Sequence, residues 1–296
     1  MLRDLKRAVW RALTTVVVAA GILAAADSSF DSAGVRISYT EEGSGEPVLL
    51  IHGYTVNAVR QWGDPGIIKG LADRYRVIAF DNRGHGQSGK PHDPGAYGGQ
   101  MAEDAIRLLD HLKIRKAHIV GYSMGGFLTV ELLTTHPDRF LTATLGGAGA
   151  KIGDGAIFNR IADSLEQGKG IGPLVVALTP PGEQTPPPEQ IDAISKMILA
   201  GNDPLALAAV SRSLSTVQPS EARIRSNRVP ALALIGEADP LKPGVDALEG
   251  VMPNLKIVVI PKANHINAPA DPLFLKTLRA FLEEHPAARA ATSAVR

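Results

Sequence analysis

The segment Gly121-Tyr122-Ser123-Met124-Gly125-Gly126 connects two apolar runs, residues 117–120 before it and residues 127–133 after it. A short apolar run, a glycine-flanked serine and a longer apolar run predict a strand, a sharp turn and a helix. Such a turn holds the serine hydroxyl clear of the backbone when neighbouring residues lack side chains, as Gly121 and Gly125 do. The chain contains 30 glycines, so glycines around a serine also occur in ordinary turns. The strand-turn-helix setting favours Ser123 as a nucleophile.

A nucleophilic serine needs a base, and the base needs a carboxylate that orients it. Asp239 follows a predicted strand at residues 231–235, and His265 follows another at residues 257–260. Because the carboxyl ends of parallel strands share one edge of a sheet, these two side chains can converge on Ser123. We predict that His265 takes the Ser123 proton and that Asp239 holds the imidazole ring.

Other titratable residues compete for both roles. His265 is the histidine that follows both Ser123 and Asp239 and stands just past a strand, a place that a loop residue capping the next helix would also occupy. Asp239 competes with Glu237, which is nearer the strand end, and with Asp154, which falls well inside a helical region. We expect the following histidines to be structural, surface or loop residues: His92, His111, His118, His136 and His285.

The oxygen that becomes negative when serine attacks a carbonyl needs donors already aimed at it, and backbone N–H groups supply them. Met124 begins the predicted helix and offers one amide. The second is assigned to Tyr54, because His52-Gly53-Tyr54 follows the strand at residues 48–51 and lets the backbone bend close to the nucleophile. His52 lies on this bend ahead of the nucleophile, so we expect it to support the backbone.

A second glycine-rich stretch, residues 84–89, matches the G-x-G-x-x-G pattern of dinucleotide-binding turns, and Asp104 lies in the position of that pattern's acidic residue. The pattern works by aiming a helix N-terminus at pyrophosphate, whereas Lys90-Pro91-His92-Asp93-Pro94-Gly95 follows here. No cofactor is therefore expected. No metal is expected either, because neither a His-Glu-x-x-His motif nor clustered ligand spacing is present.

Alternating strand and helix patterns predict a mostly parallel sheet covered by helices. Residues 35–40 alternate between apolar and polar side chains, as in a half-exposed strand. The other predicted strands are apolar runs at residues 48–51, 77–80, 118–120, 142–145, 231–235 and 256–260. Helical periodicity marks residues 101–112 and 273–282. The alternation breaks at residues 150–228, where helical patterns at 157–165, 190–199 and 205–214 predict an inserted cap. Residues 179–188 are rich in proline, which lacks a backbone donor and fixes φ, so an exposed connector is expected there.

The N-terminal residues differ in composition from the rest of the chain. Residues 1–26 contain four early cations and an apolar stretch that ends in Ala24-Ala25-Ala26, which predicts an export signal cleaved after Ala26. The apolar stretch is shorter than the roughly 20 residues that span a bilayer. An uncleaved membrane anchor and a cytoplasmic amphipathic extension are the competing interpretations. We expect an exported protein, periplasmic or secreted, that meets a membrane only through an uncleaved N-terminus.

Segment boundaries follow from these patterns: an export signal or anchor at 1–26, a first core part at 27–149, a helical cap at 150–228, a second core part at 229–285 and a flexible tail at 286–296. The 31 basic and 30 acidic residues give a net charge of +1 and no electrostatic footprint for nucleic acid. The absence of cysteine excludes disulfides, thiol catalysis and lipid attachment through cysteine.

Five motifs succeed one another along the chain: His52-Gly53, Asp81-Asn82-Arg83-Gly84-His85-Gly86-Gln87-Ser88, the turn around Ser123, Asp239 and His265. Their order resembles that of the α/β-hydrolase family from about Val35 to Leu282, and its esterase, lactonase and cofactor-free haloperoxidase-like branches in particular. The resemblance implies an eight-stranded, mostly parallel sheet, a helical cap over the pocket, and a loop at residues 81–88 that buttresses the site. Dehalogenases and epoxide hydrolases of this kind carry aspartate at the nucleophile position, so Ser123 argues against both. One position differs from the family pattern: Ala263 stands two residues before His265, where relatives often have glycine.

The resemblance and the residues together predict a serine hydrolase that cleaves a carboxylic ester or lactone, a small-molecule substrate, through an acyl-enzyme at Ser123. A C–C bond hydrolase or a lyase would use the same three residues. A ligand-binding module with little turnover is the alternative from another class. No sequence feature indicates the oligomeric state.

Overall fold

The computed structural model describes residues 28–150, 155–217 and 219–287. The predicted export signal at residues 1–26, the competing carboxylate Asp154 and most of the predicted tail lie outside these described residues.

The central feature is an eight-stranded sheet with the order β1-β2-β4-β3-β5-β6-β7-β8. Strands β1 and β2 pair antiparallel, β2 pairs antiparallel with β4, and the strands from β4 to β8 are parallel. The bounds are β1 Ser28–Ser32, β2 Val35–Glu42, β3 Glu46–Ile51, β4 Tyr75–Phe80, β5 Ala117–Tyr122, β6 Phe140–Gly146, β7 Ala231–Gly236 and β8 Leu255–Ile260. The predicted eight-stranded, mostly parallel sheet is confirmed.

The central strands appear in the sequence as continuous apolar runs because both of their faces are buried. All residues of β5 and β7 are buried, as expected for parallel strands covered on both faces. Strand β1 was not predicted, because Ser28-Ser29-Phe30-Asp31-Ser32 has no apolar run. It forms by pairing with β2 in a register that sets Phe30 opposite Ile37.

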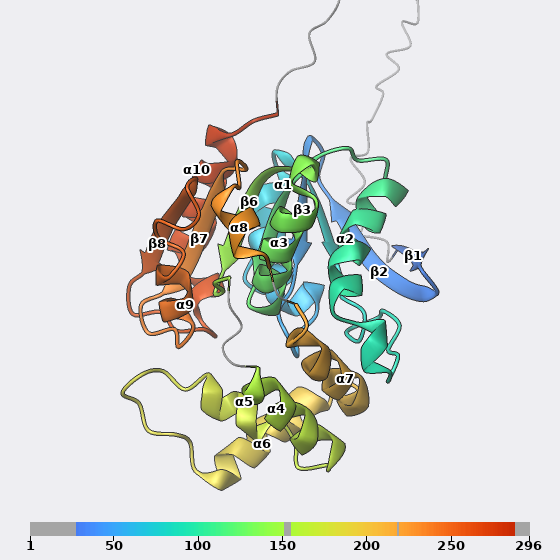
Figure 1. Ribbon diagram of the computed structural model, residues 1–296, viewed down its shortest axis with the longest axis vertical. Coiled ribbons are helices and arrows are strands. Elements are labelled where there is room, and N and C mark those ends of the chain that lie inside the picture. The colour runs from blue at the N-terminus through green and yellow to red at the C-terminus, as the bar shows by residue number, and fades with distance from the viewer. Residues whose placement is uncertain (1–27, 151–154, 218, 288–296) are drawn as a thin grey trace, which may run out of the picture.

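Helices cover both faces of the sheet and create two separate cores (Figure 1). One face carries α2 Gly99–His111, α3 Met124–Thr135, α8 Glu221–Arg225 and α9 Lys242–Asp246; the other carries α1 Ile67–Ala72 and α10 Pro272–Glu284. Alternation along β3 divides its side chains between them, with Leu49 and Ile51 in the first core and Val48 and Leu50 in the second. Predicted helices at 101–112 and 273–282 correspond to α2 and α10.

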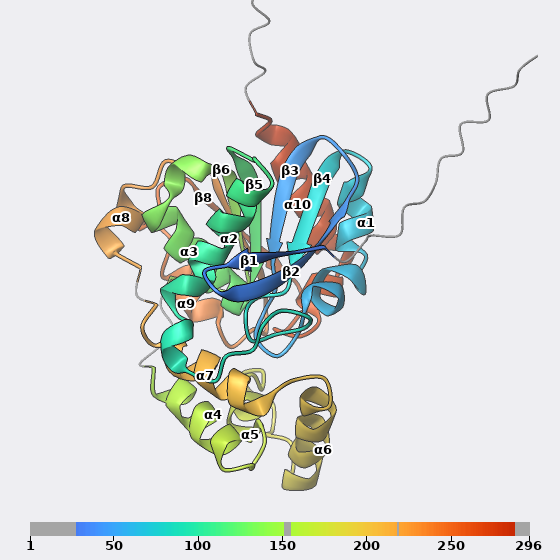
Figure 2. The ribbon, with the colours of Figure 1, turned by 90° about the vertical axis from the view of Figure 1, so that its right-hand side faces the viewer.

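Of the five described helices between β6 and β7, four form a cap that stands apart from the sheet in both ribbon views (Figures 1 and 2), whereas α8, inside the predicted cap bounds of 150–228, packs on the main core. The four cap helices are α4 Ala156–Glu166, α5 Gly172–Ala177, α6 Pro188–Leu199 and α7 Pro204–Leu214. They share a small core that includes Ile161, Leu165 and Leu207. The short helix α5 was not predicted, since six residues beginning Gly-Pro carry little periodicity.

The proline-rich stretch runs as a largely exposed connector from Thr179 to Pro187. Helix α6 begins at Pro188, two residues before the predicted start, because proline suits the first turn of a helix where its missing N–H is not needed. Among the described helices, no single one is long and apolar enough to cross a bilayer, and α6 and α7 reach that length only jointly, across a 100° bend.

Candidate active site

Ser123 lies in a strained backbone conformation at the turn from β5 to α3. Its φ of 53° is in the left-handed region, which costs a residue with a side chain about 1–3 kcal/mol. The Ser123 N–H donates to the Gly146 carbonyl at 2.8 Å, and the Ser123 carbonyl accepts from the Phe127 N–H at 3.1 Å. These bonds to β6 and α3 hold the serine at the tip of the turn.

Gly121 and Gly125 are required by close backbone contacts. A Cβ on Gly121 would overlap the Gly125 carbonyl, and a Cβ on Gly125 would overlap the Ile51 carbonyl at the end of β3. The turn is therefore packed directly against the neighbouring strand, which is possible because Gly121 and Gly125 have no side chains.

The structure brings Ser123, His265 and Asp239 together from three separate strand ends. Ser123 Oγ lies 2.9 Å from His265 Nε2, and His265 Nδ1 lies 2.9 Å from Asp239 Oδ2. Because a carboxylate only accepts hydrogen bonds, Nδ1 carries the proton and Nε2 is free to accept from the serine hydroxyl. His265 is 4% exposed and Asp239 1% exposed, so the base and its carboxylate are shielded from water.

The competing residues occupy other positions. Glu237 accepts a hydrogen bond from the Lys262 N–H at the surface. His92 contacts Asp203, and His118 lies inside β5 against Thr142. The other histidines are held elsewhere: His111 beside Tyr39, His136 beside Glu103 and His285 on the Phe281 carbonyl.

Tyr122 is a supporting residue that the sequence prediction did not include. Its hydroxyl donates to the His265 carbonyl at 2.6 Å, and its ring lies 5.4 Å from the imidazole, centroid to centroid. Burial, with a smaller contribution from the Asp239 charge, raises the pKa of Tyr122 well above its usual value. The hydroxyl therefore stays protonated and keeps the His265 backbone in place.

The two predicted oxyanion residues, Tyr54 and Met124, both line the cavity that contains Ser123 and His265. Met124 is the first residue of α3, where amides have no partner within the helix. Within the part of the chain that the structure describes, neither amide donates to a protein acceptor. The loop approaches the nucleophile closely, since a Cβ on Gly53 would lie 3.3 Å from Ser123 Cβ.

His52 is fully buried and supports this loop. Its Nδ1 donates to the Gly53 carbonyl at 2.7 Å, and its Nε2 accepts from the Asn82 N–H at 2.9 Å. Burial lowers the pKa of His52 to about 4, so the ring is neutral near pH 7. A neutral ring fixed by two backbone bonds is a structural element, as the sequence suggested.

The loop at residues 81–88 is a second support. The Asp81 carboxylate accepts from the Ala58 and Gln87 amides, and the Ser88 hydroxyl donates to the Asp81 carbonyl at 2.6 Å. The stretch after residue 89 is not an α-helix. Asp104, in the position of a ribose-binding acid, forms a buried 2.6 Å ion pair with Arg83. The stretch at residues 84–89 therefore lacks the helix that the dinucleotide pattern requires, and Asp104 is part of a buried ion pair.

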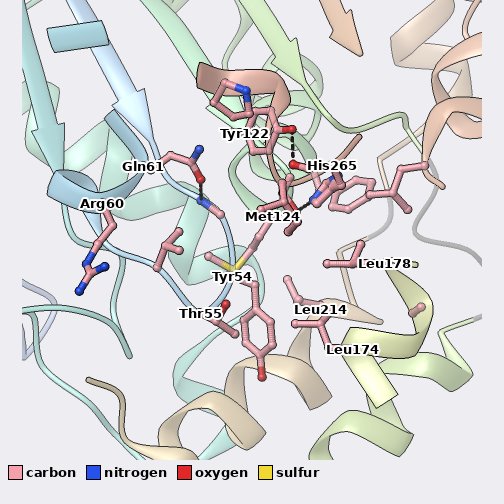
Figure 3. Close-up of a pocket in the computed structure, with 18 of the residues that line it drawn as sticks. Tyr54, Thr55, Arg60, Gln61, Tyr122, Met124, Leu174, Leu178, Leu214 and His265 are labelled. Atoms are coloured by element: carbon pink, nitrogen blue, oxygen red, sulfur yellow. Dashed lines mark hydrogen bonds between the residues drawn. The ribbon is translucent and has the colours of Figure 1, made fainter. Parts of the chain in front are cut away.

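A cavity of about 550 Å³ opens onto Ser123 and His265. Figure 3 shows Leu174, Leu178 and Leu214 of the cap on one side, with Tyr122, Met124 and His265 opposite and Arg60 and Gln61 on a further wall. The cap side is apolar, with Ile157, Phe158 and Ile161 completing it. Across the described residues, no group of three or more His, Cys, Asp or Glu side chains is placed to hold a metal.

Gln61 is a further site residue that the sequence prediction missed. It belongs to η1, a π-helical turn at Val59–Gly63, and its Oε1 accepts from the Gly53 N–H at 3.4 Å. The sequence around it shows no periodic or turn pattern that distinguishes this position, so only the fold reveals that η1 forms a wall of the cavity.

Comparison with known proteins gives a consistent family. Residues 46–168 match the family model described as alpha/beta hydrolase fold. The chain is 30% identical over 214 residues to 3-oxoadipate enol-lactonase 2 of Acinetobacter baylyi, covering 70% of this chain and 77% of the relative. Several other curated relatives are matched over less than two thirds of their own length.

Solved structures of an enol-lactonase and an esterase share the fold of this chain. The enol-lactonase from Burkholderia xenovorans LB400 superimposes with a TM-score of 0.74 at 24% identity, covering 86% of this chain and all of that one. A thermophilic esterase from Thermogutta terrifontis superimposes with a TM-score of 0.69 at 25% identity, covering 88% of this chain and 98% of the esterase.

Proposed function

The chain belongs to the α/β-hydrolase family and is a hydrolase of that fold, and from this premise we propose that it cleaves a carboxylic ester or lactone through an acyl-enzyme on Ser123. The observation that carries the proposal is the unbroken chain of contacts Ser123 Oγ to His265 Nε2 and His265 Nδ1 to Asp239 Oδ2, each 2.9 Å long. This arrangement suits proton transfer from a serine hydroxyl to a neutral imidazole.

In the proposed acylation, Ser123 Oγ attacks the substrate carbonyl carbon while His265 Nε2 takes the hydroxyl proton. The Tyr54 and Met124 amides donate to the oxygen that becomes negative. When the tetrahedral intermediate collapses, the C–O bond to the leaving group breaks and His265 returns the proton to that oxygen. Asp239 stabilises the imidazolium that exists between these steps.

Deacylation repeats the same steps with water. His265 removes a proton from water, which attacks the acyl carbon, and the bond to Ser123 Oγ then breaks as the serine regains its proton. The products are a carboxylic acid and an alcohol, joined in one molecule when the substrate is a lactone.

The cavity supports a substrate with an apolar acyl or ring portion of modest size. Its apolar wall comes from α4, α5 and α7, and its volume of about 550 Å³ falls within the range of small-molecule sites. The names of the similar enol-lactonase and esterase support carboxylic acid derivatives as the substrate class.

The test is turnover of p-nitrophenyl butyrate and of a small lactone panel by the wild type and by Ser123→Ala. We expect Ser123→Ala to lower kcat by more than about 10⁴-fold with an unchanged circular dichroism spectrum, because the nucleophile is lost without a change in packing. Undiminished turnover by the variant would refute the assignment. Turnover of C–C substrates, with esters and lactones inert, would show that the same residues break another bond.

Export is proposed separately, on the leader pattern of residues 1–26 alone. Mass spectrometry of the mature protein tests it: an N-terminus at Asp27 in a periplasmic or secreted fraction is the expected result. A chain that keeps Met1 in the cytoplasm would contradict it.

A further inference from the structure

The turn that follows β3 connects the nucleophile to the cap. Tyr54 Oη donates to the Leu207 carbonyl in α7 at 2.7 Å. One residue further, the Thr55 carbonyl accepts from Asn202 Nδ2 at 3.0 Å, and Asn202 is itself tied to the Ile198 carbonyl at the end of α6. Two consecutive residues of this turn are therefore bonded to the cap.

Thr55 has a backbone conformation that needs outside support. Its φ of 67° lies in the left-handed region, which is unfavourable for a β-branched residue. Such conformations persist when surrounding contacts fix them. The Asn202 amide, bonded to the Thr55 carbonyl, is the cap contact that supplies this restraint.

Tyr54 belongs to both parts of the molecule. Tyr54 packs against both the main core and the cap core, and its ring lies 6.0 Å, centroid to centroid, from the buried His85 ring. Figure 3 shows the side chain pointing from the turn toward the cap, while the residue itself lines the cavity beside Met124. A movement of α7 would thus be transmitted to the Tyr54 backbone.

We propose that Tyr54, through its hydroxyl, and Asn202 are positioning residues through which the cap sets the direction of the Tyr54 amide toward the oxyanion. The inference rests on the proposed function, in which that amide stabilises the tetrahedral intermediate. Donors of this kind act because they are aimed before the reaction begins, so a small displacement of the turn reduces their effect. The cap then contributes to the rate of the chemical step as well as to substrate binding.

The experiment compares Tyr54→Phe and Asn202→Ala with the wild type. We expect each variant to lower kcat on p-nitrophenyl butyrate by about tenfold, a part of the 10²–10³-fold loss that follows removal of an oxyanion donor. KM is expected to stay within about twofold, because ground-state contacts are unchanged. Affinity for an alkylboronic acid, which forms a tetrahedral adduct with an active serine, should weaken by the same factor as kcat.

His92→Ala is the matched control. The His92 ring joins the main domain to Asp203 of the cap at 2.9 Å, but its contact does not involve the turn after β3. It is half-exposed, so its removal leaves the packing intact. We expect kcat and boronate affinity close to those of the wild type, and thermal melts identify any variant that has lost its fold.

The outcomes separate the two proposals. An active wild type with unchanged kcat and boronate affinity in Tyr54→Phe and Asn202→Ala would overturn the inference and leave the proposed function standing. An equal loss in His92→Ala would also overturn it, since any loosening of the cap would then suffice. A wild type without ester or lactone turnover would overturn the proposed function and the inference with it.

Discussion

Asp239 determines which nitrogen of His265 carries the proton. Its Oδ2 faces His265 Nδ1, and its Oδ1 accepts from the Leu241 N–H at 2.8 Å. Both oxygens are therefore used as acceptors in a site that is almost fully buried. The carboxylate cannot rotate without losing one bond, which keeps Nε2 unprotonated and directed at Ser123.

Replacing this carboxylate by its amide tests that role. In Asp239→Asn, the amide oxygen keeps the bond to Leu241 and the NH₂ group is left facing His265 Nδ1, which then has to accept. The imidazole proton moves to Nε2 and blocks proton transfer from Ser123, so we expect kcat to fall by about 10³–10⁴-fold with little change in stability. Steady-state kinetics measure it. Glu237→Gln, at the competing surface carboxylate, serves as the control, and equal losses in both would contradict the assignment.

The positions of Ser123, Asp239 and His265 could be predicted because each lies shortly after the end of a recognisable strand. The contribution of Tyr122 could not, although it stands beside Ser123. Its hydroxyl contacts a carbonyl 143 positions away, and no local pattern encodes that partner. Gln61 was missed for the same reason, because its role depends on how η1 folds against the β3 turn.

At the scale of the element, the strand-turn-helix unit of β5 and α3 is fixed by backbone packing. This unit could be predicted from the sequence because glycines at these positions indicate where two backbone segments approach closely. Strand β1 and helix α5 lack any such local signal. Strand β1 exists through its hairpin pairing with β2, which is local in sequence, and through the Ser32 hydroxyl, which donates to the distant Asp104 at 2.5 Å.

Gly125→Ala is predicted to break this unit. The added methyl group would overlap the Ile51 carbonyl, and backbone cannot move aside as a flexible side chain can. We expect a loss of about 3 kcal/mol or more in the free energy of unfolding, together with loss of activity. Urea denaturation measures the change. Gly99→Ala at the start of α2, where a Cβ meets nothing within 4 Å, should stay within about 1 kcal/mol of the wild type, and a tolerated Gly125→Ala would contradict the packing argument.

At the scale of the whole molecule, the cavity arises between two parts that the sequence predicted separately. The sheet could be predicted from its apolar runs, and the cap could be predicted from a stretch of helical periodicity that contains no strand pattern. Which cap side chains face Ser123 was not, because direction depends on how α4, α5 and α7 dock on the sheet. The apolar wall of Leu174, Leu178 and Leu214 is thus a property of the assembled fold.

The buried histidines predict how stability depends on pH. Burial lowers the pKa of His52 to about 4 and that of His85 to about 3, against 6.5 for an unperturbed imidazole. Between the folded-state pKa and the unfolded value of 6.5, each histidine binds more protons in the unfolded chain than in the folded one. The free energy of unfolding is therefore highest above about pH 7 and falls as the pH drops below 6.5. We expect a loss of about 1–2 kcal/mol per histidine by pH 5. Urea unfolding from pH 7.5 to 5 measures it, and a constant free energy of unfolding would contradict neutral burial.

The central claim is that Ser123 carries the acyl group during turnover. The most direct measurement is mass spectrometry of protein quenched with acid during hydrolysis of p-nitrophenyl butyrate, followed by peptide mapping. We predict a butyryl group on the peptide that contains Ser123, and its absence in Ser123→Ala. An unmodified Ser123 peptide during sustained turnover, with a short-lived adduct excluded by rapid quenching, would contradict the account.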